Sequence, residues 1–197
     1  MTRSFIAFFT LILLMLARAS DLITTFFFDP DLRHEANAVA VLLGRTWGSL
    51  IVPALILFIL LTIGLYLYGR GGGLKLVRSP KTLRKFVGLW VRTVVLDRQP
   101  FRAYFPRGSH ANQGREAVRF FGLAVSWALI FGSFTAVYAW FALYGPVTTH
   151  RRIFSLSSIG SFTAAPSLLS VIGFSFGSYI FFRYEFEAHR KRSIERN

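Results

Sequence analysis

Residues 47–68 of this 197-residue chain read WGSLIVPALILFILLTIGLYLY and contain no charged side chain. An α-helix needs about 20 consecutive, mainly apolar residues to cross a hydrocarbon core roughly 30 Å thick. This stretch is long enough and apolar enough to do so. It therefore predicts a transmembrane helix.

Three further stretches have a similar length and composition, at about 4–28, 120–144 and 163–182. A strand of this length is uncommon, and an isolated strand in lipid would leave its backbone groups without hydrogen bonds. The alternation of a membrane β-barrel is missing. Because 53% of the residues are hydrophobic and only 16% are charged, we expect an all-α integral membrane protein. Residues 1–197 would form a single membrane domain, a four-helix bundle.

The first stretch has a second interpretation as a cleavable signal peptide. Arg3 precedes an apolar segment at 5–16, and Ala17-Arg18-Ala19 resembles a cleavage site. Apolar residues resume beyond that site at Leu22 and Ile23, as they would in a complete span. Both interpretations stay open at this point.

The basic residues are distributed unevenly and predict the topology. Twelve Lys or Arg lie within 69–119, against Asp97 and Glu116, and the tail at 183–197 is also basic. Basic loops stay in the cytoplasm, so we expect this loop, the tail and both termini on the cytoplasmic side, in a bacterial inner membrane. Orientation and attraction to anionic lipid headgroups explain the net charge of +14 without nucleic acid.

An amphipathic helix is predicted in the cytoplasmic loop, over about 80–96. Its apolar residues repeat every three or four positions, while basic residues share the opposite face. We expect it to lie at the lipid interface, although a protein partner could cover the same apolar stripe. The residues assigned to the lipid surface are Lys81, Arg84, Lys85, Trp90 and Arg92. The segment that follows, 97–114, is expected to be an irregular loop.

Polar residues gather at the end of the first span and just after it. On a helix, Asp21 lies one turn from Arg18 and Thr25, so these side chains can meet. Charge within a span is costly, so Asp21 should face inward and pair with Arg18 or Thr25. The cluster is either a structural pair or a small polar or cationic ligand site. Its members are Arg18, Asp21, Thr24, Thr25, Glu35 and Asn37.

The residues Asp21-Leu22-Ile23-Thr24-Thr25 and Glu35-Ala36-Asn37 resemble a D-x-x-T-T … E-x-N signature. This signature is found in small bacterial polytopic membrane proteins of unknown function, which often carry Pro where this chain has Ala38. The resemblance covers under a fifth of the chain. It implies a polytopic membrane protein and supplies no reaction or substrate.

Small residues in the later spans predict close helix packing, within the chain or with another copy or partner. They are Gly132, Ala136, Gly173 and Gly177. No cofactor is indicated and no metal site is predicted, since His34-Glu35 lacks the second His of a zinc-binding helix. No catalytic constellation is recognisable. We therefore rank an accessory or structural subunit of a membrane assembly first, a small-ligand binding or transport protein second and an intramembrane enzyme third.

Overall fold

The computed structural model describes residues 2–33, 41–71, 80–94, 109–144 and 159–194. All regular structure in these ranges is α-helical, and no strand occurs there. The helices are α1 (Arg3–Phe28), α3 (Trp47–Gly69), α4 (Leu83–Val94), α5 (Ser109–Tyr144) and α7 (Ile159–Ile194). Among the described residues, three helices are long and apolar enough to cross a membrane: α1, α3 and α5. The expectation of a helical membrane protein is thus supported.

Helices α1 and α3 begin at local hydrogen-bond signals in the sequence. The Thr2 hydroxyl accepts a bond from the Phe5 amide at the start of α1. Thr46 and Ser49 form a reciprocal capping box at the start of α3, which satisfies amides that a helix would otherwise leave unpaired. The bounds lie within one residue of the predicted spans.

Helices α5 and α7 extend well beyond the apolar windows that predicted them. Helix α5 begins at Ser109 rather than near 120, so the last part of the expected irregular loop is helical. Helix α7 begins at Ile159 and continues to Ile194, so much of the expected tail is helical too. The apolar stretches that predicted these spans contain only the residues suited to the hydrocarbon core of a membrane. Tertiary packing stabilises helices past those limits.

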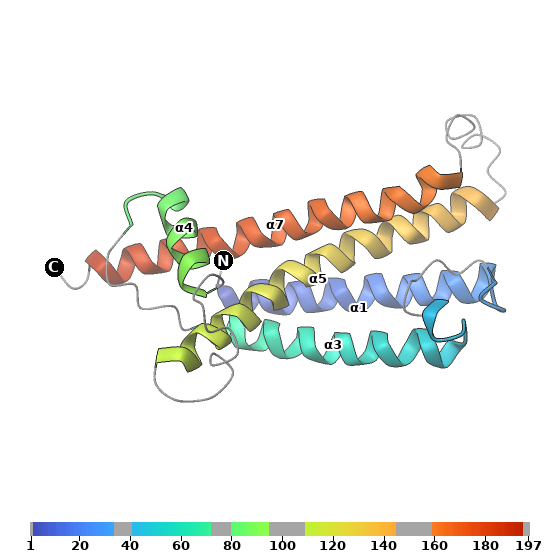
Figure 1. The fold of residues 1–197 in the computed structure, drawn as a ribbon, viewed down its shortest axis with the longest axis horizontal. Coiled ribbons are helices and arrows are strands. Elements are labelled where there is room, and N and C mark those ends of the chain that lie inside the picture. The colour runs from blue at the N-terminus through green and yellow to red at the C-terminus, as the bar shows by residue number, and fades with distance from the viewer. Residues whose placement is uncertain (1, 34–40, 72–79, 95–108, 145–158, 195–197) are drawn as a thin grey trace.

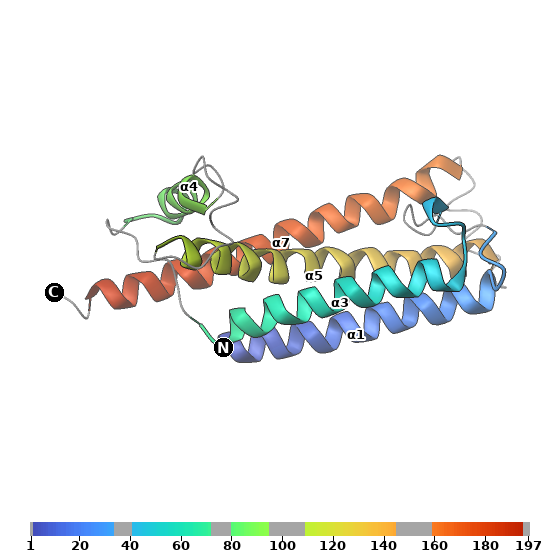
Figure 2. The same cartoon turned by 60° about the horizontal axis from the view of Figure 1, so that its bottom comes forward.

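Helix α5 occupies the centre of the arrangement. It packs along α7 and also contacts α1 and α3, which pack against each other. Helix α4 contacts α7 and α5 and lies on the side of α5 away from α1 and α3 (Figures 1 and 2). The start of α1, the end of α3 and the end of α7 lie at the same end of the molecule as α4, which we call the α4 end.

Glycines bring the helix backbones into close contact. A Cβ added to Gly122 of α5 would lie 2.6 Å from the Gly64 Cα in α3. On α7, a Cβ at Gly177 would lie 2.8 Å from the Ala124 Cα, and one at Gly173 would meet the Trp127 carbonyl oxygen. Gly173 and Gly177 therefore face α5 within the same chain. Gly132 and Ala136 are half-buried on α5.

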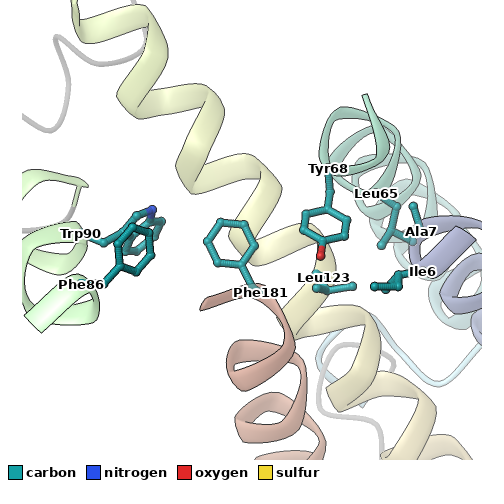
Figure 3. Close-up of a cluster of buried hydrophobic side chains, with 8 residues drawn as sticks. All are labelled: Ile6, Ala7, Leu65, Tyr68, Phe86, Trp90, Leu123 and Phe181. Carbon is teal, nitrogen blue, oxygen red and sulfur yellow. The ribbon is translucent and has the colours of Figure 1, made fainter. Parts of the chain in front are cut away.

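The aromatic residues of α4 pack against protein. Trp90 and Phe86 are buried in a cluster that continues through Phe181 of α7 to Tyr68 of α3 (Figure 3). The Trp90 ring lies 5.7 Å from Phe181 and 5.1 Å from Phe120. Trp90 was expected at the lipid surface, and this position differs because α5 and α7 extend far enough to cover it. Lys81, Arg84, Lys85 and Arg92 are exposed, as their shared face suggested.

The close contact between Gly122 and Gly64 predicts that one methyl group added at Gly122 destabilises the protein, whereas one added at a glycine without near neighbours does not. Gly122→Ala should lower the melting temperature in detergent, because overpacking a tight helix contact costs about 1–3 kcal/mol. The matched control is Gly88→Ala in α4, where an added Cβ meets nothing within 4 Å. That change should be neutral or stabilising by up to about 1 kcal/mol, through helix propensity. Equal melting temperatures for the two variants would contradict the close contact.

Candidate functional site

The predicted polar cluster contains a three-residue network that joins α1 to α5. Nη1 of Arg18 donates to Oδ2 of Asp21 over 2.8 Å and to Oγ of Ser133 over 3.2 Å. The Ser133 hydroxyl also lies 3.4 Å from the same Asp21 oxygen. Both charged side chains are largely shielded, with 22% and 18% of their surfaces exposed. We call this network the Arg18–Asp21–Ser133 triad.

Two other residues of the predicted cluster, Thr24 and Thr25, take part in hydrogen bonds of the α1 backbone. The Thr24 hydroxyl donates to the carbonyls of Ser20 and Asp21. Thr25 is buried, and its carbonyl accepts the amide of Asp29 where α1 ends. Glu35 and Asn37 lie outside the described residues, so the convergence predicted for them with Asp21 stays a prediction. Among the described residues of the cluster, Arg18 and Asp21 join α1 to α5 through Ser133.

A second and more deeply buried charge cluster lies at the α4 end, and the sequence analysis did not single it out. Arg119 of α5 is ion-paired with Glu116 one turn earlier and with Glu185 of α7, the latter over 2.6 Å. Nη2 of Arg3, at the start of α1, lies 3.0 Å from the same Glu185 oxygen. We call these four residues the arginine–glutamate cluster. Its two positive and two negative charges link three helices.

Arg119, Glu116 and Glu185 are almost fully removed from the surface, whereas the Arg3 side chain is 17% exposed. The Arg119 side chain has 0% of its surface exposed, and the two glutamates have 4% and 3%. Aromatic rings adjoin it, since the Arg119 Cζ lies 5.8 Å from the centre of the Tyr68 ring and 6.0 Å from that of Phe181. Guanidinium groups are attracted to such rings. Burial makes each ion depend on its counterions.

All four residues of this cluster lie outside the apolar stretches that predicted the spans, so sequence reasoning did not find them. Glu116 and Arg119 lie where a basic loop was expected, and Glu185 lies where a tail was expected. The i,i+3 spacing of Glu116 and Arg119 was the available signal, because such a pair meets on one helix face. Nothing in the sequence indicated that Glu185, 66 positions later, would join them.

A partly open groove of about 220 Å³ lies beside the Arg18–Asp21–Ser133 triad. Helix α3 lines most of it between Ser49 and Leu61, α1 contributes Leu14 and Arg18, and α5 contributes Leu129. The lining is mainly aliphatic, so Arg18 is the charged group in its wall. Arg18 thus belongs both to the triad and to the lining of this groove.

No protein-family model, curated protein or solved structure matches this chain. The resemblance based on Asp21, Thr25, Glu35 and Asn37 therefore stays a prediction.

The buried position of Glu185 predicts a large loss of stability when its charge is removed. Glu185→Gln should destabilise the protein by about 3–5 kcal/mol, because Arg119 and Arg3 would keep buried positive charge without that carboxylate. The matched control is Glu187→Gln on the same helix. Glu187 pairs with Arg183 at the surface, where both side chains are more than half exposed.

The control variant should change stability by less than about 1 kcal/mol. Thermal unfolding of the purified protein in a mild detergent, with retention of helical circular dichroism as the readout, compares the two. Similar melting temperatures for Glu185→Gln and Glu187→Gln would contradict the structural importance of the buried cluster.

Proposed function

We propose that this protein is an accessory or structural subunit of a membrane protein assembly. The observation that carries the proposal is that its buried charges are paired with one another. Arg119, Glu116, Glu185 and Arg3 compensate one another across α1, α5 and α7, and Arg18 and Asp21 compensate each other within α1. Charges arranged in this way fix helix positions. They suit a scaffold better than a site that binds and releases a charged substrate.

In this proposal α7 is the fourth span and both termini are cytoplasmic. The support is that the start of α1 and the end of α7 lie at the same end of the molecule (Figure 1), as an even number of crossings requires. The exposed basic residues of α4 lie at that end and would meet anionic headgroups at the cytoplasmic surface of a bacterial inner membrane.

The alternative of a site for a small polar or cationic ligand is less well supported. Such a ligand would have to compete with Arg18 and Ser133 for Asp21. Breaking a shielded ion pair leaves an arginine without its counterion. The intramembrane enzyme remains third. The Ser133 hydroxyl lies beside the Asp21 carboxylate, but that carboxylate is the counterion of Arg18, which makes it a weak base for activating a nucleophile.

The topology is testable with reporter fusions in the intact cell. A reporter active only outside the cytoplasm should be active after His150 and inactive near Pro100 and after Asn197. The reason is the excess of Lys and Arg in 69–119 and in the tail. A cytoplasm-specific reporter at the same positions is the control. An inactive fusion after His150 or an active one near Pro100 would contradict the four-span arrangement.

The subunit proposal predicts a heteromeric complex of defined stoichiometry. The full chain, tagged at its C-terminus and extracted from its native membrane in mild detergent, should migrate with a different polypeptide. Native mass spectrometry should give one fixed ratio of the two chains. An unrelated polytopic protein with the same tag and expression level is the control. Recovery of the chain only as a monomer or homo-oligomer would contradict the proposal.

A further inference from the structure

The groove between α1 and α3 has a donor group in its wall that the triad leaves partly unused. A guanidinium has five N–H donors. Within the described part of the chain, Arg18 donates through Nη1, to Asp21 and Ser133. Nε and Nη2 carry the remaining donors on a side chain that lines the groove. In a hydrocarbon environment, donors that no described residue satisfies favour a further oxygen acceptor.

The depth of Arg18 indicates which molecule would supply that acceptor. Arg18 lies ten residues before the end of α1 at Phe28, or about 15 Å along the helix axis. The phosphate and ester oxygens of a lipid lie near the membrane interface, far from this level. A transmembrane helix can present a polar side chain at any depth.

A second copy of this chain fits the groove poorly. Two copies with the same membrane orientation, related by a twofold axis through this face, would place both Arg18 side chains at one depth. The N–H donors of one Arg18 would then face those of the other. The counterion Asp21 does not line the groove and is already bonded to Arg18 on the α5 side.

The acceptor is expected to be neutral. Asp21 already balances the charge of Arg18, so a second carboxylate would add uncompensated negative charge within the membrane, at a high cost. A hydroxyl or carboxamide oxygen completes the hydrogen bonding without adding charge. Ser, Thr, Asn and Gln supply such oxygens and commonly bond across transmembrane helices.

We propose that the groove between α1 and α3 binds a transmembrane helix of a different subunit, which places a Ser, Thr, Asn or Gln oxygen against Arg18. The aliphatic lining between Ser49 and Leu61 receives the apolar side chains of that helix. This inference rests on the proposed subunit function and assigns its docking face. The face is the groove side of α3 together with the Arg18 side of α1.

The test uses a photoreactive amino acid placed singly in the full-length chain in its native membrane. One position is Ala54, which lines the groove. The matched control is Ile56, two residues away on α3, exposed and outside the groove lining. After irradiation, mass spectrometry maps the crosslinked peptide. Ala54 should capture a transmembrane segment of another polypeptide with Ser, Thr, Asn or Gln within one turn of the crosslink, and Ile56 should capture mainly lipid.

The role of Arg18 is tested by replacing the ion pair as a unit. The double variant Arg18→Leu/Asp21→Leu removes the donor without leaving a lone charge, so the fold should persist. The yield of the Ala54 crosslink should fall about tenfold, the effect expected for losing an interhelical polar contact. Ala54→Trp, which fills the groove, and Ile56→Trp, which does not, form a second pair that leaves Arg18 and Asp21 intact. Only Ala54→Trp should reduce the amount of complex.

Several outcomes would overturn the inference. These are crosslinks from Ala54 to lipid only, to a second copy of this chain only, or to a segment with no Ser, Thr, Asn or Gln near the crosslink. An undiminished yield in the Arg18→Leu/Asp21→Leu variant would also overturn it. If the complex is intact but its crosslinks come from Ile56, the docking face is wrong while the proposed function stands. If no complex exists, both fail.

Discussion

The burial of the Arg119 guanidinium is the constraint on which the rest of the structure depends. A fully desolvated arginine is tolerated only when counterions surround it. Here the counterions come from α5 itself, through Glu116, and from α7, through Glu185. Arg3 places the start of α1 against the same Glu185 oxygen. Sliding α7 along α5 by one turn would separate these ions, so their pairing fixes the register of the two longest helices.

Close backbone contacts make that ionic register compatible with dense packing. Gly173 and Gly177 let α7 approach α5 at Trp127 and Ala124, and Gly64 meets Gly122 where α3 crosses α5. The aromatic cluster around Phe181 then fills the space at the α4 end and holds α4 through Trp90. Without a hydrophobic force between helices in lipid, contacts of this kind provide much of the association energy. The ion pairs of Arg119 determine the register in which these helix contacts form.

Sequence reasoning recovered the features that depend on local composition. The bounds of α1 and α3 follow from apolar length, and the meeting of Arg18 with Asp21 follows from helical spacing. The extensions of α5 and α7 did not follow, because an apolar window ends at polar residues even where the helix continues through them. The site at Arg119 was missed for the same reason. Its partners lie far apart in the sequence, and no local pattern specifies a contact between Arg119 and Glu185.

The two charge clusters also explain why the groove lies beside α3. Helix α1 is tied ionically to α7 through Arg3 and is hydrogen-bonded to α5 through the Arg18–Asp21–Ser133 triad. Helix α3 has no charged residue between Trp47 and Gly69. Its polar contact with α1 at the α4 end is the bond from the Ser4 hydroxyl to the Gly69 carbonyl. Packing around Gly64 therefore holds α3 near that end. At the other end the Trp47 indole donates to the Pro30 carbonyl, and Leu50 packs against Leu32. The groove with Arg18 in its wall lies between these two anchored ends of α3, so in the proposed assembly a partner helix could occupy it without displacing the contacts that hold α3.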